Sequence, residues 1–271
     1  MLVLLPPSET KRSGGSSAFD PATLRAPEAL GAARERVRAA LVELSRDEEA
    51  AAKPLKLGVK NRGELLHNLE LDRSGALPAV DRYTGVLYDA LDAPSLGGEA
   101  RSWLETHVLV QSALFGLIRA ADPIPAYRLS AASRLPALGA SLKRVWVEAH
   151  ATLDWSGAGL ILDLRSKDYA ALAAVPGAIP LDVVQRAADG EVRALNHFNK
   201  AAKGDLVRRL ALAGESFEQV EEMLGWAASS GLEMTASRET GGLVLVTDLG
   251  APKTPGVLAR ASSSNAGPPP R

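Results

Sequence analysis

Residues 107–129, HVLVQSALFGLIRAADPIPAYRL, join a strongly apolar run to an arginine, an aspartate, two prolines and a Tyr-Arg pair. The apolar residues would continue almost all round a helix, which is typical of a helix at the centre of a core. We therefore predict one long helix over residues 99–119. A rigid turn follows at 122–125, where Asp122 and two prolines restrict the backbone. This turn is expected to hold Tyr127 and Arg128 away from the helix end.

The segments around this stretch alternate irregularly between helix and strand patterns. Residues 21–52 carry apolar side chains at helical spacing, with Arg34 off the apolar stripe, and predict an amphipathic helix. Strands are predicted at 2–5, 160–164, 179–184, 191–198, 231–237 and 243–248, with hairpin turns at 187–190 and 238–242. Further helices are predicted at 63–71, 142–153, 166–175, 199–213 and 216–226. Because no regular βαβ order is present, the predicted class is α+β, with a mixed sheet and several packed helices. We expect one domain over residues 1–258 and a disordered tail over 259–271.

Composition limits the function classes that need to be considered. The 271 residues are 46% hydrophobic and carry a net charge of −1, so nucleic acid or acidic lipid could be bound only by a local patch. The absence of cysteine excludes thiolate metal sites, and the four histidines lack metal-ligand spacing. No metal and no cofactor is predicted. The sequence shows neither a signal peptide nor an apolar run of about 20 residues, so we expect a soluble, cytoplasmic protein without a membrane partner.

The segment PPSETKR, residues 6–12, directly follows the first predicted strand. Ser8, Thr10 and Lys11 could gather an anion at the strand end, because hydroxyl and ammonium groups are hydrogen-bond donors. The alternative is an ordinary solvated loop. The segment is not a phosphate-binding loop, since it lacks the GxxxxGK[ST] pattern.

A second basic segment, KPLKLGVKNR, occupies residues 53–62 and contains no acid. Its cations are Lys53, Lys56, Lys60 and Arg62. Leu57-Gly58-Val59 lies between two predicted helices, which is the layout of a helix-hairpin-helix element. Such an element binds DNA phosphate through the N–H groups at the start of its second helix. An ordinary basic connection between helices is the alternative.

Arg119, Tyr127 and Arg128 follow the central apolar run. Arg119 at a helix end is explained by the helix dipole alone. Tyr127 and Arg128, held by a rigid turn, suit recognition of a carboxylate or phosphate. The alternative is an internal ion pair of Arg119 or Arg128 with Asp122.

The segment NHFNKAAKGDLVRRLA, residues 196–211, places Lys203 on the apolar arc of a predicted helix. Lys200 and Arg208 lie beside each other on a different face. A lysine on a buried arc is costly unless it meets an anion or reaches water. We therefore predict that Lys203 and Arg128 line one concavity, within roughly 10 Å of each other. A frayed first helical turn would remove the anomaly.

Five stretches resemble the YaaA family, in the family's order. They are LVLLPPSETK, YTGVLYDAL, SALFGLIRAADPIPAYRL, LDLRSKDY and FNKAAKG. The densest match, LFGLIRAADPIPAYRL, is similar to the family's L(Y/F)GxLRPLDxxxPYRL and retains Arg119, Asp122, Pro125, Tyr127 and Arg128. It departs from that pattern at Ala120, Ala121 and Ala126. The resemblance implies a bacterial peroxide-stress protein that limits iron-dependent oxidative damage, with a helix-hairpin-helix element and a basic cleft for duplex DNA.

Two functions follow from these observations. The favoured hypothesis is a non-enzymatic stress protein that binds duplex DNA largely independently of sequence, through phosphate contacts. Its cleft would be lined by Lys53, Lys56, Lys60, Arg62, Arg119, Arg128, Lys200, Lys203 and Arg208. The alternative is an enzyme or binding protein for a small anionic metabolite in the same cleft, surrounded by Ser8, Lys11, Tyr127, Arg128 and Lys203. In that case desolvation would lower the pKa of Lys203. No catalytic residue is predicted.

Overall fold

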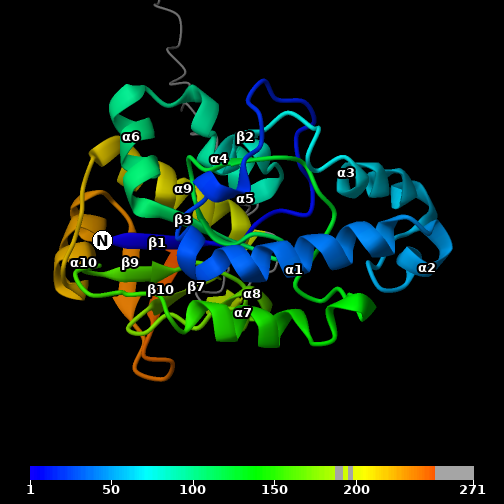
Figure 1. Ribbon diagram of the computed structural model, residues 1–271. Helices are drawn as coiled ribbons and strands as arrows, with labels where there is room; N and C mark the ends of the chain where they lie inside the picture. Colours follow the sequence, from blue (N-terminus) through cyan, green and yellow to red (C-terminus); the bar gives the residue numbers. More distant parts are fainter. Residues whose placement is uncertain (187–191, 195–197, 248–271) are drawn as a thin grey trace, which may run out of the picture.

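The strands form one large sheet and a separate two-stranded pair in the computed structural model, which describes residues 1–186, 192–194 and 198–247 (Figure 1). The strands are β1 (Leu2–Leu5), β2 (Leu77–Pro78), β3 (Val108–Ser112), β4 (Gly116–Arg119), β5 (Pro123–Ile124), β6 (Ile161–Asp163), β7 (Ile179–Arg186), β8 (Val192–Ala194), β9 (Glu233–Ala236) and β10 (Leu243–Thr247). The α-helices are α1 (Pro27–Ser45), α2 (Glu48–Ala52), α3 (Leu65–Leu69), α4 (Ala79–Arg82), α5 (Val86–Leu91), α6 (Gly98–His107), α7 (Leu142–His150), α8 (Lys167–Ala170), α9 (Phe198–Ala213) and α10 (Val220–Ser229). Short 3₁₀ helices are η1 (Pro21–Thr23), η2 (Val59–Glu64), η3 (Ala93–Ser95) and η4 (Pro136–Leu138).

The large sheet is mixed, with the strand order β4-β3-β1-β6-β7-β10-β9 and with β8 paired to β7. The inner strands β3, β1, β6, β7 and β10 are parallel to their neighbours in this series. The strands β4, β8 and β9 each pair antiparallel with one of them. The predicted α+β class with a mixed sheet is therefore confirmed.

The central strand β1 is buried on both of its faces. Val3 and Leu5 belong to the larger hydrophobic core, whereas Leu4 belongs to a smaller cluster with Leu109 and Ile161. Alternate side chains of a strand point to opposite faces, so the two clusters cover the two sides of the sheet. An unbroken apolar run such as LVLL is typical of a strand in this position.

Helix α1 crosses the molecule with α4 and α6 on one side and α7 on the other (Figure 1). Its predicted apolar stripe is confirmed, since Leu30, Val37 and Leu41 are fully buried. The placement of Arg34 off that stripe was wrong. Arg34 is only 3% exposed, and its guanidinium donates to the carbonyl groups of Phe115 (2.8 Å) and other residues of neighbouring segments.

The predicted helix over residues 99–119 is wrong beyond residue 107. Helix α6 ends at His107, and the apolar run after it forms the antiparallel hairpin of β3 and β4. Gly116 enters β4 with a φ of +66°, and a Cβ atom there would lie 2.6 Å from the Trp146 ring. A strand buried on both faces lacks polar alternation, so periodicity cannot separate it from a buried helix. The predicted turn at 122–125 contains β5, which pairs with β2.

Most of the other predicted elements are confirmed. The strand near residue 162, helices α7 and α9, and the hairpin of β9 and β10 lie where they were expected. The pairing of β7 with β8 is also confirmed, while the predicted turn between them lies outside the described residues, as does the predicted tail. In the described part of the chain, no helix has the length and apolar character needed to cross a membrane.

His150 connects α7 to the β3–β4 hairpin and depends on being neutral. Its Nε2 accepts the backbone N–H of Leu117 (3.2 Å), and its Nδ1 lies 2.7 Å from the Trp146 carbonyl oxygen, so the single ring proton belongs on Nδ1. Burial lowers the pKa of the His150 imidazole from 6.5 to about 4, partly opposed by the hydrogen bond to Trp146. Protonation of Nε2 would remove the link to β4.

We predict a pH dependence of stability that originates at His150. Because its folded pKa lies below the unfolded value, the unfolded chain binds the proton first as the pH falls. The free energy of unfolding should then decrease from pH 6.5 to about 4, by up to about 3 kcal/mol from this group. Urea unfolding across this range should show the component in the wild type and in His67→Leu. His150→Leu should lack it, and an unchanged slope in that variant would contradict the assignment.

Candidate functional site

A cavity of about 370 Å³, here called the β1–β6 crevice, lies outside the carboxyl ends of β1 and β6. Its walls are residues 6–10 after β1, residues 84–88 at the start of α5, Ser166 and Tyr169 after β6, and Lys200 of α9. The chain places β3 on one side of β1 and later places β6 on the other side. Ligands of open parallel sheets bind at such a reversal of strand order, beyond the carboxyl ends.

Hydroxyl groups are the main polar feature of the crevice. Thr10 Oγ1 lies 3.3 Å from Ser8 Oγ and accepts from Thr84 Oγ1 at 3.0 Å. The Tyr169 hydroxyl accepts the backbone N–H of Ala131 (3.4 Å). Burial raises the pKa of Tyr169 to about 12, so its O–H remains a donor at neutral pH. These groups can form hydrogen bonds with a polar ligand from several directions.

Lys11 lies behind this wall and fixes the loop that forms it. Its Nζ donates to the carbonyl groups of Ser8 (2.9 Å) and Glu9 (3.2 Å), and it lies 4.1 Å from the centre of the Tyr127 ring. Burial, and after it the nearby Arg128 guanidinium, lowers the pKa of Lys11 from 10.5 to about 7. The carboxylates of Glu64 and Glu9 oppose that shift. Lys11 therefore acts here as a clamp that shapes residues 8–11.

Tyr127 is a buried support of the site, which corrects the expectation that the turn projects its phenol toward an anion. It is 2% exposed, and its hydroxyl lies 2.8 Å from both Ser112 Oγ and Tyr83 Oη. Burial raises the pKa of Tyr127 well above its usual value, so the phenol stays neutral. Its ring supports Lys11, and its hydroxyl joins the end of β3 to the end of α4.

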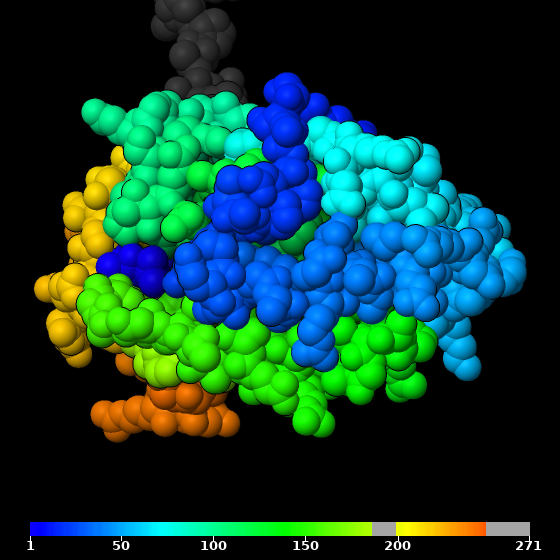
Figure 2. Space-filling view, in the orientation of Figure 1, coloured from blue at the N-terminus to red at the C-terminus, as the bar shows by residue number. Residues whose placement is uncertain are grey.

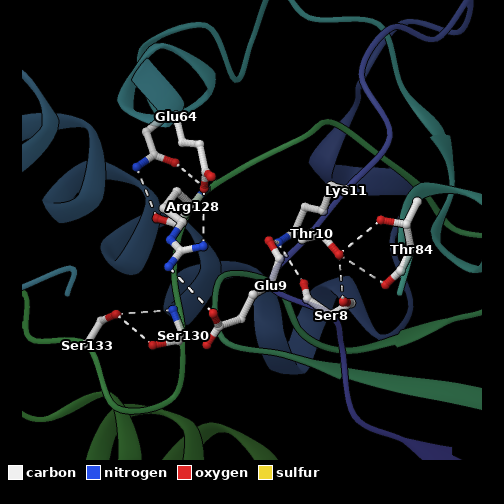
Figure 3. A network of polar contacts seen from close by, with 10 residues as sticks. Ser8, Glu9, Thr10, Lys11, Glu64, Thr84, Arg128, Ser130 and Ser133 are labelled. Atoms are coloured by element: carbon white, nitrogen blue, oxygen red, sulfur yellow. Dashed lines mark hydrogen bonds and ion pairs between the residues drawn. The ribbon is translucent and has the colours of Figure 1, made fainter. Parts of the chain in front are cut away.

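Arg128 has carboxylate partners within the protein, as Figure 3 shows. Its guanidinium lies 3.2 Å from Glu64 and 3.6 Å from Glu9, and its side chain is 10% exposed. The Asn68 side chain accepts the backbone N–H of Arg128 (2.7 Å) and donates to its carbonyl (3.1 Å). Arg128 therefore connects α3 with the loop after β1.

Lys200 and Lys203 lie one turn apart on α9 but have different surroundings. Lys200 is exposed, lines the β1–β6 crevice and has no ion-pair partner among the described residues. Lys203 is half-buried, and its Nζ donates to the Leu164 carbonyl (3.1 Å) at the end of β6. Burial lowers the pKa of Lys203, as expected, against the carboxylates of Asp182 and Asp163. Since Arg128 and Lys203 each have carboxylates nearby, the expected shared anion is not supported.

The remaining predicted cations serve other parts of the fold. Arg119 is at the end of β4 and not at a helix end, 3.6 Å from Asp122, which confirms the alternative of an internal ion pair. Arg208 donates to the carbonyl groups of Leu91 and Asp92 (both 3.0 Å) and so caps the end of α5.

The basic segment 53–62 does not form an isolated positive patch. Lys56 and Lys60 are exposed, but Arg62 pairs with Glu48 (3.1 Å) and Glu49 (2.6 Å) of α2. The segment runs into η2 between two five-residue helices, and the helix-hairpin-helix element is not confirmed.

Sequence reasoning missed several residues that complete the site. Glu9 and Glu64 were missed because the partners of an arginine lie far away in the chain. Ser166 and Tyr169 belong to the stretch LDLRSKDY, which supported a predicted helix and the family resemblance but was not predicted as part of a site. Within the described ranges, no group of three His, Asp or Glu residues could hold a metal ion. The crevice instead offers hydroxyl donors and the ammonium group of Lys200, which suit a hydroxylated anion such as a phosphate ester.

Comparison of the sequence with known proteins identifies its family. The sequence model described as "Peroxide stress protein YaaA" matches residues 1–237. A UPF0246 protein of Streptomyces coelicolor is 43% identical over 246 residues, which cover 87% of this chain and 92% of that protein. A UPF0246 protein of Corynebacterium glutamicum is 41% identical over 238 residues, covering 86% and 94%. The matched region includes every wall of the β1–β6 crevice.

We predict that Lys11 gives the protein a second pH dependence, of the same sign as that of His150 but at higher pH. Because its folded pKa is lowered to about 7 from 10.5, the folded chain loses this proton at lower pH than the unfolded chain. The free energy of unfolding should therefore rise between about pH 7 and 10.5, by less than about 5 kcal/mol. Chemical unfolding of Lys11→Met should lack this rise. A rise of equal size in that variant would exclude Lys11 as its source.

A further prediction concerns Gly204, which lets α9 approach α5. A Cβ atom at Gly204 would lie 2.1 Å from the Leu87 carbonyl oxygen. Gly204→Ala should therefore move the helices apart, lower the free energy of unfolding by roughly 1–3 kcal/mol and displace Lys200, one turn away. Gly225→Ala on α10 is the control, because a Cβ atom there meets nothing within 4 Å. Equal stability of both variants would contradict the close contact.

Proposed function

This chain belongs to the peroxide stress protein YaaA family, and from that premise we propose that it acts in the response to hydrogen peroxide by binding a small anionic metabolite. The proposed site is the β1–β6 crevice. The ligand class is a compact, hydroxylated anion, such as a sugar phosphate, whose hydroxyl groups would meet Ser8, Thr10 and Tyr169. Lys200 would meet its charge.

The observation that carries this proposal is the position of the cavity. About 370 Å³ of space lies where the strand order reverses, beyond the ends of two parallel strands. This volume is within the range of sites for small molecules. Lys200, which has no ion-pair partner among the described residues, adds a positive charge to its wall. The support for the loop comes from Lys11 and Tyr127, so the wall is formed before any ligand binds.

Duplex DNA is the competing partner, and the distribution of charge favours the metabolite. Arg62 and Arg128 already face carboxylates, and Arg208 is committed to backbone carbonyl groups. A duplex is bound through many contacts between cations and phosphate groups. Cations that are already paired within the protein contribute little to such binding. The exposed lysines of segment 53–62 that a duplex would need are Lys53, Lys56 and Lys60.

Calorimetric titration with inorganic phosphate as the probe tests the proposal. We predict that Lys200→Ala weakens phosphate binding about tenfold, since about 1.4 kcal/mol is a typical loss for one charged contact. The double variant Lys200→Ala/Ser166→Ala should bind phosphate more weakly still, because Ser166 also lines the crevice. Lys143→Ala, at an exposed lysine of α7, is the matched control and should bind as the wild type does.

The same variants separate the two partners. Lys200→Ala should fail to protect peroxide-treated cells that lack their own copy of the gene, whereas Lys143→Ala should protect them. Absence of phosphate binding by the wild type would refute the metabolite site. Salt-dependent binding of a short DNA duplex that is lost in Lys56→Glu/Lys60→Glu, with no effect of Lys200→Ala, would establish the DNA hypothesis instead.

A further inference from the structure

A second cavity lies on a different part of the molecule, between the segment before α1 and α1 itself. Its volume is about 220 Å³, and we call it the Phe19–Phe115 groove after the two rings that line it. The other lining residues are Pro21, Ala22, Pro27, Gly31, Arg34, Glu35 and Arg38. Figure 2 shows the dark-blue segment before α1 lying against the lighter-blue helix. No residue of the β1–β6 crevice contributes to this groove.

The groove is apolar except for the buried cation Arg34 and the paired side chains of Glu35 and Arg38. The centres of the Phe19 and Phe115 rings are 5.5 Å apart, and prolines cover both ends of the loop that faces α1. Gly31 leaves one wall open, because a Cβ atom there would meet nothing within 4 Å. A flat apolar group would fit against the two rings and pass over Gly31.

Arg34 is the cation in this wall, and its hydrogen bonds are incomplete. Nε and Nη2 donate to the carbonyl groups of Phe115 and Arg25, but the buried Nη1 has no acceptor among the described residues. Burial lowers the pKa of Arg34 to about 10, which reflects the cost of keeping its charge away from water. A buried N–H without a partner is unusual and costs about 1–3 kcal/mol.

No carboxylate of the described residues forms an ion pair with Arg34. Asp122 is the acid that acts on it, but Oδ2 of Asp122 already accepts the backbone N–H groups of Arg25 (2.8 Å) and Arg119 (3.0 Å). At the groove rim, Arg38 pairs with Glu35 (2.9 Å) and with Asp72 (2.6 Å). The rim charges are thus paired with one another, whereas Arg34 has no ion-pair partner of its own among the described residues.

We propose that the Phe19–Phe115 groove binds a small carboxylate with a flat apolar body. The body would lie against the two phenyl rings. The carboxylate would accept a hydrogen bond from Nη1 of Arg34. Charge complementarity selects a carboxylate over a neutral ligand, because only an anion compensates the buried charge. The volume admits about one aromatic ring with a short acidic group. This inference is independent of the function proposed for the crevice.

Benzoate is the probe, and the full chain is titrated with it and with benzamide by calorimetry. Benzamide has the same shape without the charge, so the wild type should bind benzoate at least about tenfold more tightly. Gly31→Leu fills the groove and should weaken benzoate binding at least tenfold. Gly225→Leu places the same side chain in an open position of another helix and should bind as the wild type does. Both substitutions favour helix formation, so folding should be retained.

Lys200→Ala identifies the site that the probe occupies. It should leave benzoate binding unchanged, because Lys200 lines only the other cavity. The proposal is overturned if the wild type does not bind benzoate. Equal binding of benzoate and benzamide overturns it too, as does full binding by Gly31→Leu.

Discussion

The hydroxyl group of Tyr127 holds together the three segments that make the site. It lies 2.8 Å from Ser112 at the end of β3 and 2.8 Å from Tyr83 after α4, while its ring carries the ammonium of Lys11. These segments are distant in the sequence and meet only because β1 and β3 are parallel neighbours. A phenol can do this in a buried place because it is large, apolar over its body and polar at its tip. The loop after β1 depends on this support.

Apart from short buried strands such as β1, most elements that the sequence predicted correctly have one buried face. Helix α1 and the hairpin of β9 and β10 show a polar face that fixes their period. The run at 108–119 failed because both sides of its hairpin are buried, so it is apolar at nearly every position. The prediction that Arg34 lies off the apolar stripe failed for a related reason. A cation on a helix is assigned to solvent by default, whereas the carbonyl groups that accept its hydrogen bonds belong to segments far along the chain.

The candidate site was predicted in part, and the limit was again the pairing of distant charges. Ser8, Lys11 and Lys200 came from local polarity and lie in or behind the crevice wall. The sequence showed Arg128 as a free cation because Glu64 and Glu9 are more than fifty residues away. A count of the charges along one segment therefore overestimates the electrostatic field of that segment, because distant carboxylates that pair with its cations are left out. A lysine such as Lys200, which has no ion-pair partner in the described part of the chain, can be recognised only after the other pairs are known.

Residues 112–115 place a common constraint on the two cavities. The Ser112 hydroxyl accepts the backbone N–H of Phe115 (3.0 Å), and the Phe115 ring meets Tyr127 edge-on at 5.3 Å between centres. The same ring also meets Phe19, at 5.5 Å between centres, and the backbone carbonyl of Phe115 accepts from Arg34. Phe115 therefore packs against Tyr127, which supports the crevice, and also forms a wall of the groove. A close-packed interior cannot adjust one side of such a ring without moving the other, so substitutions there should disturb both sites together.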